Sequence, residues 1–200
     1  AFAPFPKSED AFLKKLAGCW WPGDGRKAVK AWKVFRDAYS NYPMNALFGY
    51  YGPMHDGPVW PLYLKPRNKP LAPTWRICYP PSGDRIGQSF SYTHTIPEIL
   101  NLCKEMSREW NKGVGILKKD LAAGKADPEM EEKLRVDEAL GIQFESGYNI
   151  LRFYDLREKM MCMKGTSRLK ILADMKKIVQ EEIGRDKKLL ELAQKDPRLG

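Results

Sequence analysis

The stretch PEMEEKLRVDEALGIQFESGYNILRFYDLREKMMCM, residues 128–163, decides the fold. Its apolar residues recur at helical spacing at Leu140, Phe144, Tyr148, Leu151 and Tyr154. Three more apolar residues widen this line: Ile142, Ile150 and Phe153. Because the apolar face is so wide, we expect the middle of the helix to lie between two neighbouring helices. Gly141 and Gly147 each cost about 1 kcal/mol relative to alanine, which predicts close helix contact or a kink there.

Two further long helices flank this stretch. Residues 95–98, Thr-Ile-Pro-Glu, form a capping box with a proline in the first turn, and predict a helix that continues to about residue 123. Residues 165–167 predict a turn, and a last helix is expected over residues 168–194. Its apolar positions are Leu172, Met175, Val179, Ile183, Leu190 and Ala193. Residues 96–200 therefore predict an antiparallel bundle of long helices.

The first forty residues predict two shorter helices. Ser8 is an N-cap for a helix that runs to about Ala17 and is expected to end at Gly18. Residues 20–25 form a turn with two tryptophans, and residues 26–39 predict a second amphipathic helix. We therefore predict a mainly α fold, a single domain over residues 1–200 with a bundle of about five helices.

Residues 40–95 interrupt the helical pattern as a long loop insertion rich in proline and aromatic residues. At its centre lies YYGPMHDGPVWPLYLKP, residues 50–66. Its repeated prolines exclude a helix interior and a central strand. Residues 75–79 predict a short strand or an extended segment. The aromatic content predicts an ordered loop, and long ordered loops are often functional.

Composition limits the classes of partner. The net charge is +9, but in the second half basic residues alternate with acidic ones as on solvated helix surfaces, which argues against nucleic-acid binding. No apolar run is long enough to cross a bilayer, so no membrane partner is expected. The four cysteines are widely spaced, which predicts buried free thiols and leaves one disulfide open. We expect no metal and no cofactor.

Catalytic chemistry has few candidates. His55 and His94 are the two histidines, both in loops, where structural or exposed roles compete with ligand contact. No serine or cysteine lies in a known nucleophile motif. Asp56 and Asp84 are the loop carboxylates, whereas the other acids lie mostly on helices, where a solvated face is the default.

The loop aromatics are the strongest functional candidates: Tyr50, Tyr51, Trp60, Tyr63, Trp75 and Tyr79. A sugar stacks its apolar face on such rings while polar groups bind its rim. Packing of the same rings onto the bundle is an equal alternative, and both roles can share residues. The predicted substrate-binding residues are Tyr50, Tyr51, His55, Asp56, Trp60 and Tyr63.

Several short segments resemble a known family. They are residues 31–39 (AWKVFRDAY), 41–43 (NYP), 57–63, 146–154 (SGYNILRFY) and 196–200 (DPRLG), together with Met106, Trp110 and Gly113. These segments are similar to the helical region that follows the catalytic (β/α)-barrel in large bacterial proteins of the glycoside-hydrolase type. The resemblance covers most of the chain, although each motif is short.

The resemblance implies an accessory C-terminal helical domain of a carbohydrate-active enzyme, whose aromatic loop contacts sugar or borders the catalytic site. Its partners would be a carbohydrate and the N-terminal catalytic barrel. The catalytic acids would lie on that barrel, so no catalytic residue is assigned here, and we expect the chain to be a piece of a larger protein. The alternative is a structural or interaction module for domain docking or for association with a second copy. Nucleic-acid binding ranks below both.

Overall fold

The computed structural model of the chain describes residues 4, 6–45, 54, 57–67, 86, 93–124 and 127–199. These residues form five α-helices and two 3₁₀ turns, with no strand among them. The elements are α1 (Glu9–Trp20), α2 (Gly25–Tyr39), η1 (Gly57–Val59), α6 (Ile96–Ala123), α7 (Pro128–Met161), α8 (Gly165–Lys195) and η2 (Pro197–Leu199). The predicted mainly α helical bundle is confirmed. The strand considered for residues 75–79 lies outside the described residues.

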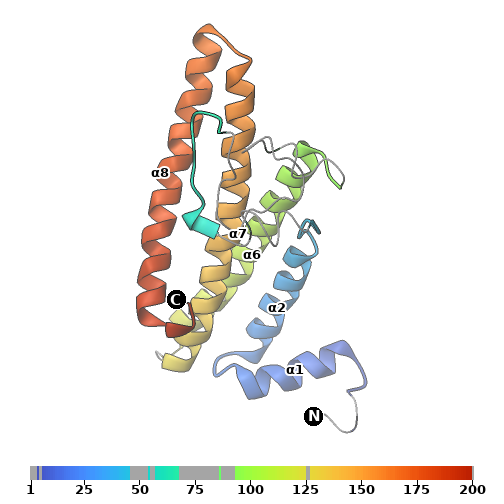
Figure 1. Cartoon of the computed structure of the whole chain (residues 1–200). Helices are drawn as coiled ribbons and strands as arrows, with labels where there is room; N and C mark the ends of the chain where they lie inside the picture. Colours follow the sequence, from blue (N-terminus) through green and yellow to red (C-terminus); the bar gives the residue numbers. More distant parts are fainter. Residues whose placement is uncertain are drawn as a thin grey trace.

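The three long helices α6, α7 and α8 run antiparallel, with α7 between the other two (Figure 1). Helix α2 packs along α6, and α1 crosses the lower end of α2. The α7–α8 hairpin extends beyond the other helices at its closed end, as Figure 1 shows. The middle of α7 is therefore covered by neighbours on two sides, as its wide apolar face predicted.

Side-chain caps fix the helix starts where the sequence predicts them. The capping box of α6 is complete, because the Thr95 hydroxyl accepts from the Glu98 amide while the Glu98 carboxylate accepts from the Thr95 amide. Ser8 caps α1. The predicted end of α1 at Gly18 is wrong, since the helix continues to Trp20. Gly18 is exposed with open space around its Cα, so its only cost is its weak helix propensity.

The start of α8 also differs from the prediction. The helix begins at Gly165, inside the segment expected to be a turn. Gly165 has a φ of 65°, a conformation that glycine adopts readily, so one residue reverses the chain and opens the helix. Two residues of the predicted apolar line of α8, Ile183 and Leu190, are 50% and 58% exposed. The contact face of α8 is therefore narrower than its apolar pattern, with Met175 and Ile178 at its centre.

Aromatic rings fill the core where α2, α6 and α7 meet. The Phe35 and Trp110 rings stack with centroids 4.2 Å apart, and Phe144 meets Trp110 edge-on at 5.0 Å. Gly113 makes room for this cluster, because a Cβ there would lie 2.3 Å from Phe35 Cε1. A Cβ on Gly141 would lie 2.9 Å from an oxygen of Asn111 on α6. The close helix contact predicted at Gly141 is confirmed.

Residues 57–67, the longest described stretch of the loop insertion, are held on α7 by side chains of that helix. The Tyr154 hydroxyl donates to the Pro61 carbonyl at 2.6 Å and accepts from the Tyr63 amide at 3.3 Å. Arg157, fully buried, donates to the Tyr63 carbonyl at 3.2 Å. Hydrogen bonds to loop backbone groups hold the segment in one position on the bundle.

Candidate functional site

A pocket of about 270 Å³ lies where the first helix meets the long helices. Its residues come from the end of α1 and the following turn, from α2, from α7 and from η2. They are Trp20, Trp21, Trp32, Lys133, Val136, Asp137 and Arg198. Three of these seven side chains are indole rings, and three carry ionisable groups. Lys133, Val136 and Asp137 are three and four residues apart, so they share one face of α7.

The turn that follows α1 and begins at Trp21 is anchored by one carboxylate of α6. Asp120 Oδ2 accepts from Trp21 Nε1 at 2.8 Å and from the Asp24 amide at 2.9 Å. Its other oxygen pairs with Lys27 Nζ at 2.9 Å. Burial alone raises the pKa of Asp120, but the hydrogen bonds from Trp21 and Lys27 outweigh burial and hold that pKa below its ordinary value. The wall of the pocket is therefore fixed before any ligand arrives.

Gly23 lies inside this turn because no side chain fits there. A Cβ at Gly23 would be 2.3 Å from Asp120 Oδ2, 2.6 Å from Met130 Cε and 2.7 Å from Trp21 Nε1. Any larger residue would displace the hydrogen bond between the indole and the carboxylate. The glycine is needed for this close approach, and not only for the flexibility of a turn.

Asp137 is the one carboxylic acid among the residues that line the pocket. Burial raises its pKa from 3.8 to about 7. Within the described residues, no hydrogen bond or ion pair reaches the carboxyl group, whereas its backbone carbonyl accepts from Trp110 Nε1 at 2.8 Å. A carboxyl group with a raised pKa in an aromatic pocket is typical of a functional site. Near neutral pH it is a hydrogen-bond donor in part of the molecules and an acceptor in the rest.

Two basic residues border the pocket, and acidic neighbours neutralise both. Lys133 Nζ lies 5.3 Å from the Trp20 ring centroid and pairs with Glu129. Arg198 pairs with Asp196 at 2.6 Å and with Glu132 at 3.0 Å. Because acidic neighbours compensate the charges of Lys133 and Arg198, these residues offer hydrogen-bond donors to the pocket without giving it a strongly positive electrostatic potential. That combination suits a neutral polar ligand better than a highly charged one.

The predicted loop site is only partly described. Tyr50, Tyr51, His55 and Asp56 lie outside the described residues. Trp60 is 3% exposed and belongs to the hydrophobic core, so stacking on a sugar would require this ring to be uncovered. Tyr63 is half-buried, with the guanidinium carbon of Arg67 4.2 Å from its ring centroid. The structure does not bring Trp60 and Tyr63 into the tryptophan pocket.

Sequence reasoning recognised the tryptophan pair as part of a turn and Trp32 as part of a helix face, but it did not join them into a site. The missing information was the contact with α7, more than a hundred residues away in sequence. A signal was nevertheless present. Two tryptophans stand side by side at residues 20 and 21, directly before a short segment with glycines at 23 and 25, and the structure leaves the Trp20 ring 61% exposed.

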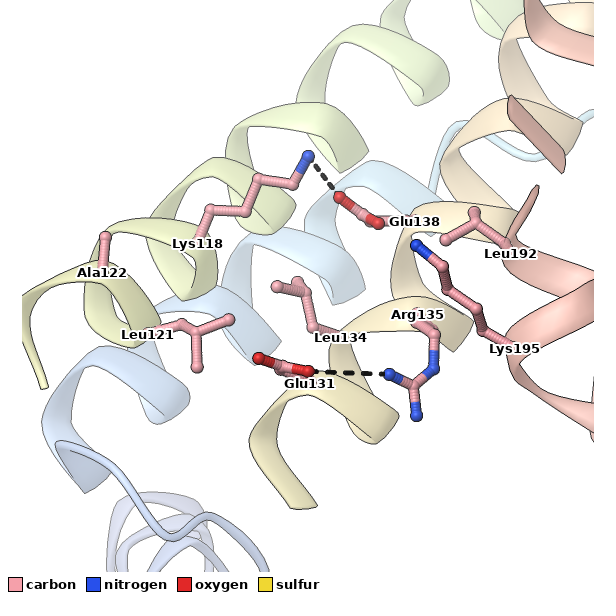
Figure 2. A pocket seen from close by; sticks show the side chains of 9 residues that line it. All are labelled: Lys118, Leu121, Ala122, Glu131, Leu134, Arg135, Glu138, Leu192 and Lys195. Atoms are coloured by element: carbon pink, nitrogen blue, oxygen red, sulfur yellow. Dashed lines mark ion pairs between the residues drawn. The ribbon is translucent and has the colours of Figure 1, made fainter. Parts of the chain in front are cut away.

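A second pocket, of about 380 Å³, lies between α6, α7 and α8 (Figure 2). Four of its five charged side chains are paired with one another. Lys118 pairs with Glu138, and Arg135 lies 4.0 Å from Glu131, as the dashed lines show. Arg135 also lies 3.6 Å from Asp196. The Lys118–Glu138 pair joins α6 to α7, and the contact between Arg135 and Asp196 joins α7 to the end of α8, so these charges stabilise the bundle and the pocket is a weaker candidate for ligand binding than the tryptophan pocket.

No group of three or more His, Cys, Asp or Glu side chains among the described residues has the arrangement of a metal site. No described helix has both the length and the apolar character needed to span a membrane. Cys103 is a buried free thiol, as expected, whereas Cys19 and Cys162 are free and exposed. His94 Nδ1 lies 3.0 Å from the Thr93 hydroxyl.

Comparisons with protein-family models, with curated proteins and with solved structures find no match to this chain. The glycoside-hydrolase resemblance therefore stays a prediction.

Proposed function

We propose that this chain is an accessory helical domain of a carbohydrate-active enzyme of the glycoside-hydrolase type, and that it binds sugar in the tryptophan pocket. Its partner within the parent protein would be the catalytic barrel. The observation that carries the proposal is the meeting of Trp20, Trp32 and Asp137 in one small pocket. Indole faces suit the C–H face of a sugar ring, and a carboxyl group suits its hydroxyls.

The dimensions and the rigidity of the pocket support the same conclusion. A volume of about 270 Å³ is at the small end of ligand pockets, which suits one sugar unit of a longer chain. The hydrogen bonds of Asp120 fix the turn in advance, so binding orders few groups and loses little affinity to that ordering. One carboxyl group in the pocket supports binding, whereas glycoside hydrolysis normally uses a pair.

The direct test is calorimetric titration of the chain with neutral and acidic mono- and oligosaccharides. We expect saturable binding to at least one sugar class. Trp20→Ala removes an exposed ring without opening the core, and should weaken that binding by roughly 5- to 30-fold, or about 1–2 kcal/mol. Absence of binding across the whole panel would refute the proposal.

The matched control is Tyr39→Ala. Tyr39 is a ring of α2 that is 53% exposed and does not line the pocket. Its removal should leave sugar affinity unchanged. Equal losses in the Trp20 and Tyr39 variants would mean that binding depends on general surface aromaticity, and the pocket would lose its assigned role.

One observation favours the second candidate function, an interaction module. Residues 161–170, at the closed end of the α7–α8 hairpin, are all exposed. They include Met161 and Met163, each 40% exposed, and Leu169, 66% exposed. Exposed apolar side chains gathered in one place are typical of a docking surface. Under this hypothesis the hairpin end packs against the parent barrel or against a second copy.

Sedimentation velocity over a range of concentrations tests the second-copy form of this hypothesis. Self-association that Leu169→Lys abolishes would support it. Leu190→Lys is the matched control, because Leu190 is 58% exposed on the same helix but far from the hairpin end. A chain that stays monomeric at every concentration would exclude association through this surface.

A further inference from the structure

A polar groove of about 430 Å³ runs along α7 between α6 and α8, apart from the tryptophan pocket. Each of the two longer walls contributes side chains at helical spacing, so the groove follows the helix axes. From α6 come Lys104, Ser107, Arg108 and Asn111; from α7 come Glu145, Tyr148, Asn149 and Arg152; from α8 come Glu181 and Arg185.

The antiparallel arrangement of α6 and α7 brings two cations to the same end of the groove. Lys118 of α6 pairs with Glu138 of α7. Equal steps in opposite directions along the two helices lead from that pair to Lys104 and to Arg152. Lys104 is the first α6 residue of the groove and Arg152 the last α7 residue, so these two side chains lie toward the same end of it.

Neither of these cations has an acidic partner among the described residues. The other two basic residues of the groove do: Arg108 pairs with Glu105 and Glu109, and Arg185 pairs with Glu145 and Glu182. Arg152 is half-buried, so its guanidinium is less hydrated than one at the surface. Two like charges at one end of a groove, neither with an ion-pair partner of its own within the described ranges, repel each other, and an anion bound between them would remove that repulsion.

Neutral donors of the same groove are also unused. The Tyr148 hydroxyl and the Asn111 amide make no hydrogen bond within the part of the chain that the structure describes. Asn149, by contrast, is engaged, since its amide donates to Glu182 at 2.9 Å. Unused donors beside an uncompensated guanidinium match the hydrogen-bonding needs of a carboxylate, which accepts at two oxygens.

We propose that this groove binds a carboxylate-bearing small molecule, held between Lys104 and Arg152. A carboxylate fits better than a phosphate dianion or a nucleic acid, because Glu145 and Glu181 line the same groove and limit its positive charge. The carboxylate has two natural sources: a uronic-acid unit of a polysaccharide or a free organic acid. The uronate source rests on the proposed function; the organic-acid source does not.

Calorimetric titration with galacturonate oligomers, succinate, neutral oligosaccharide and inorganic phosphate separates these sources. We expect a carboxylate ligand to bind and Arg152→Gln to weaken it by about tenfold or more. Lys104→Gln should weaken it less, because an ammonium cannot grip a carboxylate at two points. Lys119→Gln is the control, an exposed lysine of α6 outside the groove, and should leave binding unchanged.

The outcomes are distinct. Binding of galacturonate alone identifies a sugar acid, and binding of succinate as well identifies a general carboxylate site. No binding of either carboxylate, stronger binding of phosphate, or equal losses in the Lys119 and Arg152 variants would overturn the proposal. Trp20→Ala should leave carboxylate binding at this groove intact, so failure of the tryptophan pocket and failure of the groove are separable. The unfolding midpoint of ligand-free Arg152→Gln should equal or exceed that of the parent chain, which shows that the variant still folds.

Discussion

Replacing Asp137 with asparagine should change the pH dependence of stability in a way that only a buried acid explains. The folded chain holds the proton of Asp137 up to a pKa of about 7, whereas the unfolded chain releases it near 3.8. Between those two values the folded state binds the extra proton. The free energy of unfolding of the parent chain therefore falls as pH rises, by ~1.4 kcal/mol per pH unit from this group alone.

Over the whole interval this loss amounts to at most ~4 kcal/mol, at 1.36 kcal/mol for each pH unit between the two pKa values. Water at the pocket mouth reduces it, because Asp137 is not completely buried. Asparagine has nearly the same shape and does not titrate. The variant should thus match the parent chain near pH 4 and be about 2–4 kcal/mol more stable at pH 8.

Urea unfolding of both chains, followed by circular dichroism at half-unit steps from pH 4 to pH 8.5, measures this difference. Subtracting one curve from the other cancels every titrating group that the two chains share. A difference that does not vary with pH would refute the reasoning, because it would mean that Asp137 is already ionised at its ordinary pKa. An NMR titration of its side-chain carboxyl carbon gives the same pKa without unfolding.

Four other substitutions test the anchoring and the packing described above. Asp120→Ala leaves three donors without their acceptor and should cost about 3 kcal/mol in urea unfolding, together with loss of sugar binding. Gly113→Ala should lower the free energy of unfolding by about 1–3 kcal/mol, because its methyl group meets Phe35. Gly115→Ala on the same helix has open space and should raise it by up to about 1 kcal/mol. Equal effects of the two substitutions would contradict the packing described. Tyr154→Phe removes the partner of the half-buried Pro61 carbonyl and Tyr63 amide and should cost about 1–2 kcal/mol. It should also speed limited proteolysis within residues 57–67, and an unchanged cleavage rate would exclude the proposed anchoring role.

The helices were predictable because their signals are local. Caps such as the Thr95 box and the apolar spacing of α7 require only neighbouring residues, and both are confirmed. Gly18 shows the limit of that approach, because a single glycine does not end a helix whose next residues continue it. The end of α1 depends instead on the anchoring of the following turn, where Asp120 binds Trp21 from ninety-nine positions away.

The candidate site was less predictable for the same reason. Its many aromatic rings made the insertion the predicted site, yet of the two predicted site rings that the structure describes, Trp60 packs into the core and Tyr63 is half-buried. The tryptophan pocket, which contains Asp137, is formed by segments far apart in sequence, and no local sequence pattern predicts that they meet. The pKa of Asp137 depends on burial by those segments, and burial is a property of the assembled chain.

The tryptophan pocket draws on residue 20 and on residue 198, so it exists only when distant segments are in place. A ligand bound there would contact both segments at once and would therefore stabilise their packing against each other. When the pocket is saturated with ligand, amide hydrogen exchange should slow in both α1 and η2, although these elements lie at opposite ends of the sequence. In a larger enzyme, a sugar bound at this pocket would reduce local unfolding across the helical domain.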